Sequence, residues 1–365
     1  MRSAIWTKEC NKLPSHKKKP APCASAGGRA FICLALIFSI LMSSLLTSCK
    51  KTPKKTISLF ALDTYVTLTV EGKEAEKAIS EGTAFISEME GKFSRQREDS
   101  EISLLNASSK DEPVTLSEET YLLLKTVCEL SEKTEGAFDP TIAPLMDLWG
   151  FGTDAPGVPE EEEILGTLSK VDYRKIHLLS GNRAYVDPDT SIDLGGAAKG
   201  YIGDLLMEKI RSFDVKRVIL DLGGNVSVWD RSSEVTVGIA SPLEASGLLC
   251  TYSSPKNETV SVITSGAYER FFEEDGVRYG HIMDTKTGRP VTTDLLSATV
   301  ISSDGTKGDC FSTTLFALGS EKARKFAVRE GIDCILCMEN GTLWVSSSLK
   351  GKVHAQDGWT IEYFA

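Results

Sequence analysis

The chain has 365 residues, of which 41% are hydrophobic and 25% are charged, an ordinary composition for a globular protein. Its charge is uneven, because residues 1–56 hold eleven Lys and Arg and a single acid, which leaves 30 basic and 50 acidic residues in the remainder. An acidic body argues against nucleic-acid binding, so we expect no nucleic-acid partner. An anionic ligand would need backbone amides, one or two lysines or a metal ion.

The N-terminal segment has the residue order of a secretion signal. Basic residues precede an apolar run at 31–46, which is shorter than the roughly 20 residues that a membrane span needs. The run ends in Leu46-Thr47-Ser48-Cys49, which resembles the lipobox of bacterial lipoproteins. We expect a signal peptide over 1–48, a lipid on Cys49 and a tether over 49–56. The alternative is an uncleaved N-terminal anchor.

This reading predicts where the protein resides. It would be exported and attached to a membrane by lipid, on the periplasmic face of the inner membrane if the cell has two membranes.

The nine cysteines form no disulfide framework. Four lie at or before Cys49, and Cys334 and Cys337 have CxxC spacing in a strand-like run with no second pair. Zinc is therefore disfavoured, and we expect buried thiols there.

The first half of the body alternates helical and strand-like patterns. Residues 57–70 are rich in β-branched and aromatic residues and predict one strand, and 73–93 has helical periodicity. Thr115-Leu-Ser-Glu118 matches a capping box, which predicts a helix that ends at Gly136. A charged loop over 153–163 should enter a short helix, and strand-like pieces continue to Asp193.

The second half contains more strands. An amphipathic helix is expected over 197–213. Strands are then predicted at 217–222, 225–229, 234–240, 248–253, 258–264, 278–283 and 297–302. Two helices, over 306–318 and 320–330, follow them and precede the final strands. The class is α+β, with a largely antiparallel sheet, flanking helices and one domain over 57–365.

The stretch SIDLGGAAKG at 191–200 joins a strand to a helix. Glycines allow a sharp turn and close approach of a ligand, and the amides at the helix start, with Lys199, favour an anion. The stretch is not a P-loop, because the GxxxxGK[ST] spacing is missing. The alternative is a tight turn with a surface lysine.

Another set of oxygen atoms lies at the start of the helix over 306–318. Asp309 and Thr313 are four residues apart and should face the same way. A carboxylate and a hydroxyl suit Mg²⁺, which also takes waters and substrate phosphates. The alternative is a helix-start carboxylate beside a threonine bonded back to its own helix.

Two further motifs offer chemistry. His281 begins HIMDTKTGRP and could act as a general base, contact a phosphate or be a satisfied core histidine. Asp284 and Gly288 should form the turn that follows. Phe138 and Asp139 place an aromatic ring beside an acid, which could bind a flat ring or pack in the core.

Taken together, these motifs resemble the ApbE family, the FAD:protein FMN transferases. The matching blocks run in the family's order through nearly all of 57–320: ALDTYVTL (61–68), FSRQREDSEISLLN (93–106), GAFDPTIAPLMDLWGFG (136–152), SIDLGGAAKGYIGD (191–204), LDLGGNV (220–226), TSGAYERFF (264–272), HIMDTKTGRP (281–290) and SATVISSDGTKGDCFSTTLFALG (297–319).

The resemblance implies an α+β domain that binds FAD without a Rossmann motif. With Mg²⁺ it would split the FAD pyrophosphate and pass FMN to a threonine hydroxyl of an acceptor flavoprotein subunit, releasing AMP. It implies metal ligation by Asp309, Thr313 and the backbone carbonyl of Gly196, and catalytic roles for Asp309, His281 and Lys199. The residues implied in binding the flavin nucleotide are Leu62, Gln96, Ala137, Phe138, Asp139, Asp193, Lys199 and Ile282.

The chain departs from the family pattern at three positions. Members often have methionine where Leu62 stands and proline where Thr285 stands. Gln96 replaces a tyrosine found in many members that transfer flavin, which leaves the balance between transfer and hydrolysis open. Two alternatives therefore remain: a Mg²⁺-dependent FAD pyrophosphatase that makes FMN and AMP, and a flavin-binding lipoprotein without chemistry.

Cys49→Ala should leave an unprocessed precursor that no longer incorporates labelled fatty acid. The reason is that the thiol is the atom that would carry the lipid. Fatty-acid labelling of cells, followed by mass measurement of the purified protein, checks this expectation. Labelling equal to that of the wild type would contradict lipidation at Cys49 and favour the plain anchor.

Overall fold

A nine-stranded sheet forms the centre of the fold. The computed structural model describes residues 52–244 and 247–365, and Lys54–Ala365 belong to one compact unit. All neighbouring strands pair antiparallel except the last two, which are parallel. In spatial order the strands are β1 (Lys54–Ala61), β2 (Thr64–Gly72), β6 (Val215–Leu222), β7 (Asn225–Asp230), β10 (Val260–Ser265), β15 (Leu295–Ser302), β16 (Asp333–Met338), β17 (Thr342–Ser346) and β19 (Thr360–Phe364).

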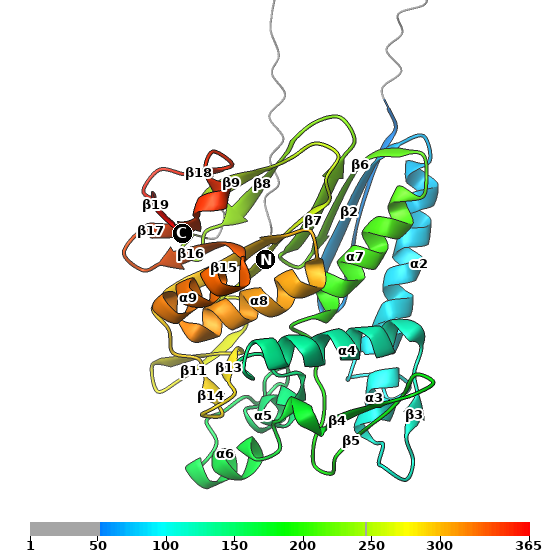
Figure 1. Cartoon of the computed structure of the whole chain (residues 1–365), viewed down its shortest axis with the longest axis vertical. Helices are drawn as coiled ribbons and strands as arrows, with labels where there is room; N and C mark the ends of the chain where they lie inside the picture. Colours follow the sequence, from blue (N-terminus) through cyan, green and yellow to red (C-terminus); the bar gives the residue numbers. More distant parts are fainter. Residues whose placement is uncertain (1–51, 245–246) are drawn as a thin grey trace, which may run out of the picture. The chain divides into compact units, whose positions relative to one another are not determined.

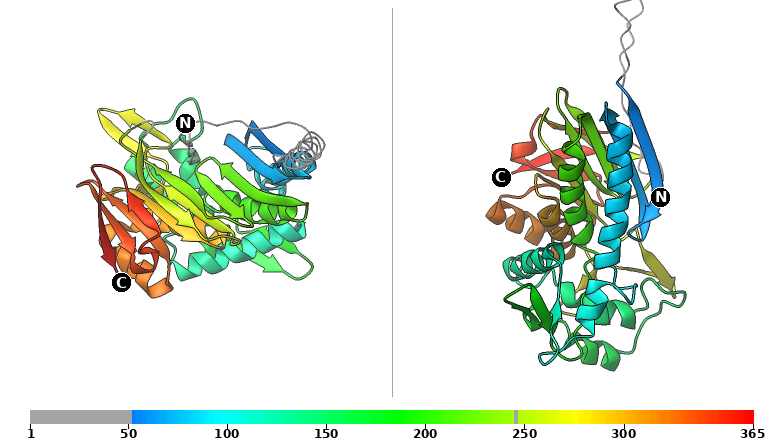
Figure 2. Two further views of the ribbon diagram at one scale, coloured as in Figure 1. Left: turned by 90° about the horizontal axis from the view of Figure 1, so that it is seen from above. Right: turned by 90° about the vertical axis from the view of Figure 1, so that its right-hand side faces the viewer.

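Four helices cover one face of this sheet (Figure 1). They are α2 (Ala75–Phe93), α7 (Ala198–Arg211), α8 (Gly305–Leu318) and α9 (Ser320–Glu330). Helical spacing aligns their apolar residues on the side facing the strands, as with Ile202, Leu206 and Ile210 of α7, none of which is exposed. Figure 2 shows this helical layer against the strands from two other directions.

A smaller sheet covers the opposite face. It consists of β18 (Val353–Ala355), β9 (Leu248–Ser254) and β8 (Val235–Ala240). Alternate residues of β8 are buried against the large sheet in a second apolar core, which includes Val237, Ile239, Val228 and Val262. The strands of the large sheet are therefore buried on both sides in this region.

Residues 94–193 form the remaining layer, below the sheet in Figure 1. The helix α4 (Glu118–Lys133) runs beneath α8, next to the short sheet β3-β5-β4. The other elements are α3 (Glu101–Asn106), β3 (Val114–Thr115), α5 (Ala143–Leu148), α6 (Glu161–Leu168), β4 (Ile176–Leu179) and β5 (Arg183–Val186). Two hairpins follow later in the chain, β11 (Phe271–Glu274) with β12 (Val277–Gly280), and β13 (Met283–Asp284) with β14 (Arg289–Pro290).

The α+β class and the largely antiparallel sheet were predicted correctly, and two local predictions were wrong. The predicted strand over 57–70 is a hairpin, because Leu62 and Asp63 have positive φ values of 54° and 56° and reverse the chain. The helix after Thr115 begins at Glu118, and Ser117 caps it by accepting a hydrogen bond from the Thr120 amide.

The predicted signal peptide and Cys49 lie outside the described residues. β1 begins at Lys54, so the last three residues of the predicted tether belong to the sheet. Within the described part of the chain, no helix is long and apolar enough to cross a membrane. Cys334 and Cys337 are buried in β16, and burial raises the pKa of both thiols to about 12.

The helices α7 and α8 approach each other most closely at two glycines. A Cβ atom on Gly200 would overlap the carbonyl oxygen of Gly305, and a Cβ on Gly305 would lie 2.7 Å from the carbonyl oxygen of Gly200. Only glycine fits at this contact, and the crossing determines how the first turns of the two helices lie relative to each other.

Gly200→Ala should lower the free energy of unfolding by about 1–3 kcal/mol, because the added methyl group forces the helices apart. The matched control is Gly91→Ala in α2, where a Cβ would meet nothing within 4 Å. That change should raise the free energy of unfolding by about 0.5–1 kcal/mol through the usual helix preference. Urea unfolding of both variants provides the measurement, and a Gly200→Ala protein as stable as the wild type would contradict the close contact.

Candidate functional site

The glycine-rich loop before α7 is held in a fixed conformation. The amide of Asp193 donates to the carbonyl of Pro140 at 2.7 Å, and the amide of Gly195 donates to Asp193 Oδ1 at 2.7 Å. A Cβ on Gly196 would lie 3.1 Å from the ring of Phe138 and 3.6 Å from Thr313 Oγ1. The backbone of Gly196 therefore lies directly against the hydroxyl of Thr313.

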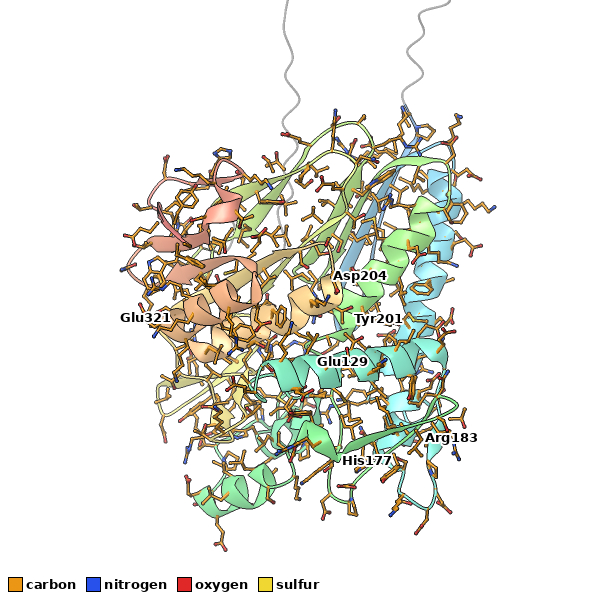
Figure 3. The ribbon with its side chains drawn as sticks, in the orientation of Figure 1. Glu129, His177, Arg183, Tyr201, Asp204 and Glu321 are labelled. Carbon is orange, nitrogen blue, oxygen red and sulfur yellow. The ribbon has the colours of Figure 1, made fainter. Side chains whose placement is uncertain are left out.

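Each of the helices α7 and α8 caps the other. The N-cap residue of α7 is Ala197, which offers no side-chain acceptor, and the amide of Gly200 donates instead to Asp309 Oδ2 at 2.9 Å. Asp204 of α7 in turn accepts from the amides of Gly305 at 2.8 Å and Thr306 at 3.1 Å. Figure 3 labels Asp204 where α7 passes the beginning of α8. These bonds hold the Asp309 carboxylate at the N-terminus of α7.

Thr313 lies one turn beyond Asp309 on the same helix. Among the described residues its hydroxyl makes only long contacts, 3.4 Å to the Asp309 carbonyl and 3.3 Å to Ser265 Oγ, whereas the Oγ atoms of Ser265 and Ser312 are 2.8 Å apart. Long bonds are weak, so the Thr313 oxygen can turn to another partner at little cost. Gly196, Asp309 and Thr313, the three residues that the resemblance implies as metal ligands, thus lie close together.

His281 and Lys199 belong to the same site. Lys199 Nζ donates to the Gly195 carbonyl at 2.9 Å, and the charges of Lys199 and Asp193 both act on His281. Burial of the imidazole is the main cause that lowers the pKa of His281 to about 4. Nδ1 of His281 lies 3.1 Å from the Arg270 carbonyl, which can only accept, so Nδ1 carries the proton and Nε2 keeps a free electron pair.

Arg95 is a residue of the site that the sequence interpretation missed. Its Nε donates to Asp193 Oδ2 at 2.8 Å and its guanidinium also binds Asp147 Oδ1 at 2.7 Å. Arg95 therefore orients the Asp193 carboxylate and offsets its charge. Its position inside the block at 93–106 was the available signal, but the partners lie 52 and 98 residues away along the chain.

Glu269 was also missed. Its Oε1 would be 3.3 Å from a Cβ on Gly224, and its carboxyl is affected by the charges of Lys199 and Asp309. Burial is the main cause that raises the pKa of Glu269 to about 7. The glycine pair Gly223-Gly224 therefore borders the same site as the pair Gly195-Gly196.

Several of the residues predicted to bind the flavin are buried or held by hydrogen bonds within the protein. The Asp139 carboxylate is buried and accepts from the amides of Thr141 and Tyr173, each at 2.8 Å, and from the Thr141 hydroxyl at 2.6 Å. These bonds hold the carboxylate in one orientation. Burial raises the pKa of the carboxyl above its usual value. Phe138 and Ile282 are buried, and the amide of Ala137 donates to the Thr134 carbonyl.

Leu62 and Gln96 lie at the margin of the site. The Leu62 amide donates to Glu90 at 2.7 Å, and the next residue, Asp63, forms an ion pair with Arg270, whose carbonyl faces His281. Gln96 is exposed and follows Arg95 directly. The residue that follows Leu62, Asp63, thus binds Arg270 beside His281, and the residue that precedes Gln96, Arg95, binds Asp193.

The oxygen atoms of the site fit a magnesium ion. One carboxylate oxygen of Asp309 is bound by Gly200 and the other has no hydrogen-bond partner among residues 52–244 and 247–365. The Thr313 hydroxyl and the Gly196 backbone add neutral oxygens, which is a hard, incomplete set of ligands that substrate phosphates and waters would fill. Within the same residues there is no group of three His, Cys, Asp or Glu side chains that could hold a metal ion.

The fold and this site define a flavin transferase of the ApbE type, and the chain belongs to the ApbE family, whose model matches residues 62–336. The FAD:protein FMN transferase of Treponema pallidum is 31% identical over 306 residues, which cover 78% of this chain and 83% of that protein. The FAD:protein FMN transferase of Klebsiella pneumoniae is 34% identical over 255 residues, 69% of this chain and 79% of that protein.

Solved structures agree with this assignment. The ApbE protein of Thermotoga maritima superposes with a TM-score of 0.76 at 31% identity, over 82% of this chain and 99% of that one. The apo form of the flavinyl transferase ApbE of Pseudomonas stutzeri gives a TM-score of 0.71 at 25% identity, over 81% of this chain and 94% of that one.

His281 should make the protein sensitive to mild acid. Its pKa is about 4 in the folded protein against 6.5 for an ordinary histidine, so unfolding takes up a proton between these values. The contribution of His281 to the free energy of unfolding should therefore fall as the pH drops from about 6.5 to 4, whereas Glu269 and Asp204, whose pKa values burial raises to about 7 and about 6, contribute in the opposite sense. His281→Gln should remove the unfavourable contribution, so over this range its stability should fall less, or rise more, than that of the wild type.

Urea unfolding at a series of pH values provides the measurement. The control is His354→Gln, which changes an exposed histidine of β18 and should reproduce the wild-type curve. An unchanged slope for His281→Gln would contradict the buried, neutral imidazole.

Proposed function

We propose that this protein transfers FMN from FAD to a hydroxyl group of an acceptor protein, with Mg²⁺, and releases AMP. The observation that carries the proposal is the meeting of Gly196, Asp309 and Thr313 at the crossing of α7 and α8, beside Lys199 and a neutral His281. Family membership supports the flavin chemistry, and the oxygen donors support the metal.

The ion would be held by Asp309, Thr313 and the Gly196 carbonyl. Bound Mg²⁺ acts as a Lewis acid that offsets negative charge on phosphate oxygens. Lys199 adds a positive charge next to the loop, and the positive end of the α7 dipole lies at the same place. Phosphoryl transfer depends mainly on positioning and charge, and these residues supply both.

His281 is suited to take the proton of the acceptor hydroxyl. Its Nδ1 proton is held by the Arg270 carbonyl, which leaves Nε2 as the basic atom, and a pKa of about 4 keeps the ring neutral at pH 7. The hydroxyl oxygen bonds to the FMN phosphorus, the bond from that phosphorus to the bridging oxygen breaks, and AMP carries this oxygen away. The hydroxyl proton passes to Nε2.

The acceptor would be a flavoprotein subunit with a threonine as its target residue. A lipid on Cys49 would keep the enzyme at the membrane surface, on the exported side, where such subunits would meet it. The basic and apolar order of residues 17–49 supports this part of the proposal.

The direct test combines purified protein, FAD, Mg²⁺ and a candidate acceptor, and then measures the intact mass of the acceptor. A gain of one FMN supports the transferase. Release of FMN and AMP without a change in acceptor mass would instead indicate a pyrophosphatase, and intact FAD after prolonged incubation would indicate a binding protein.

Asp309→Asn should reduce Mg²⁺-dependent FAD cleavage by more than about 100-fold, because a direct ligand loses its charge. The amide oxygen still accepts from the Gly200 amide, so the melting temperature should stay close to that of the wild type. Asp304→Asn is the control, since Asp304 caps the same helix through the Lys307 amide. Normal turnover by Asp309→Asn would contradict the metal assignment, as would an equal loss in the control.

Gln96→Tyr should lower the release of FMN and AMP in the absence of acceptor, and spare transfer. Gln96 is exposed, polar and adjacent to Arg95, so it can order a water that competes with the acceptor hydroxyl, which a tyrosine ring would exclude. AMP release with and without acceptor measures both reactions. Glu98→Tyr places the same ring at another exposed position of the loop and should leave hydrolysis unchanged. Equal hydrolysis by the wild type and Gln96→Tyr would remove the support for this role.

A further inference from the structure

Asn225 carries a buried amide group without a hydrogen-bond partner. Its side chain is only 5% exposed, and Nδ2 makes no hydrogen bond to any residue in 52–244 or 247–365. Leaving a buried donor unpaired costs free energy that an apolar side chain of the same shape would avoid. A group of this kind calls for an explanation, and its position in the fold offers one.

The position of Asn225 follows from the contacts of its strand with α7. Ser227, two residues further along β7, faces α7, since its Oγ would lie 3.4 Å from a Cβ on Gly203. Further on, Trp229 stacks with Arg211 of the same helix, 4.6 Å from the ring centre. Strand and helix thus run in the same direction, and Asn225 is on the same side of the sheet as Ser227.

Two residues towards the start of β7 from Ser227 is Asn225, and about one turn towards the start of α7 from Gly203 is Gly200. Asn225 therefore faces the first turn of α7, where the Gly200 amide binds Asp309. The residue opposite Asn225 in the sheet is Ile263, whose Cδ1 would lie 2.8 Å from a Cβ on Gly308, the neighbour of Asp309. Asn225 is thus directed at the crossing of α7 and α8.

The turn before Asn225 borders the candidate site as well. Gly224 lies against Glu269, whose carboxyl is affected by the charges of Lys199 and Asp309. Ser265, the residue two beyond Ile263 on β10, contacts the Thr313 hydroxyl. The residues next to Asn225 along its strand and across the sheet therefore contact Glu269 and the helix that carries Asp309.

We propose that Asn225 is a substrate-binding residue whose side-chain amide donates a hydrogen bond to a non-bridging oxygen of the FAD diphosphate. The proposal rests on the proposed function, and deepens it by assigning a role to the residue that follows Gly223-Gly224. The amide is neutral, so it stabilises added negative charge without repelling Mg²⁺.

Asn225→Leu tests the proposal, because leucine has nearly the same shape and no polar atom. The melting temperature of the ligand-free protein should stay equal or rise, since an unpaired donor is removed. The affinity for FAD in the presence of Mg²⁺, measured from flavin fluorescence, should fall about 10- to 100-fold, as expected for loss of a hydrogen bond to a charged group.

Ser254→Ala is the matched control. Ser254 Oγ is buried and also unpaired, but it belongs to β9 in the small sheet on the other face. Its removal should likewise leave the melting temperature equal or higher, and the affinity for FAD should match that of the wild type.

Two results would overturn the proposal. The first is an affinity of Asn225→Leu for FAD equal to that of the wild type. The second is a melting temperature of Asn225→Leu that is below that of the wild type without ligand and that FAD still raises by as much as in the wild type. If the leucine variant does not fold, Asn225→Ala decides the matter, since alanine removes the donor without adding volume and should weaken FAD binding by a similar factor. A wild-type protein that binds no FAD would contradict the proposed function itself, which the variants do not address.

Discussion

The contact between the first turns of α7 and α8 is the constraint on which the site depends. A helix N-terminus needs acceptors for its free amides, and here each helix supplies one to the other, Asp309 to α7 and Asp204 to α8. Gly200 and Gly305 let the backbones come close enough for both bonds. The carboxylate of Asp309 is thereby held beside Gly196 and Thr313 by the packing of the fold itself.

The site combines groups of opposite charge in a protein whose body is acidic. Arg95 offsets Asp193 through a direct bond, Lys199 lies against the glycine loop, and His281 stays neutral at pH 7 because desolvation lowers its pKa to about 4. A metal ion at Asp309 would reverse the local field for a diphosphate. An anionic substrate can therefore bind without a basic surface.

Local patterns in the sequence predicted much of the fold and could not predict its contacts. Apolar spacing identified the helix over 197–213 and the strands around it within a few residues. The hairpin at Leu62 was missed because leucine rarely adopts a positive φ and the turn at residues 61–64 contains no glycine. The helix cap was predicted at Thr115 and lies two residues later at Ser117, because the residues from Thr115 to Glu118 match the capping-box pattern.

In the candidate site, too, the sequence identified residues but not the contacts between them. The resemblance to the ApbE family brought Gly196, Asp309, Thr313, Lys199 and His281 forward, and the fold brings these residues together. Arg95, Glu269 and Asn225 were missed because their significance comes from partners distant in the chain. Asp139 was predicted as a flavin contact, which stays a prediction, and the three hydrogen bonds that hold its carboxylate could not be foreseen from the sequence.

The most direct test is a crystal structure of the protein soaked with Mn²⁺ and FAD, with anomalous data recorded for the metal. The account predicts an anomalous peak within bonding distance of Asp309, the Thr313 hydroxyl and the Gly196 carbonyl, with the diphosphate completing the coordination. A peak at another position, or bound FAD whose diphosphate lies away from the crossing of α7 and α8, would contradict it.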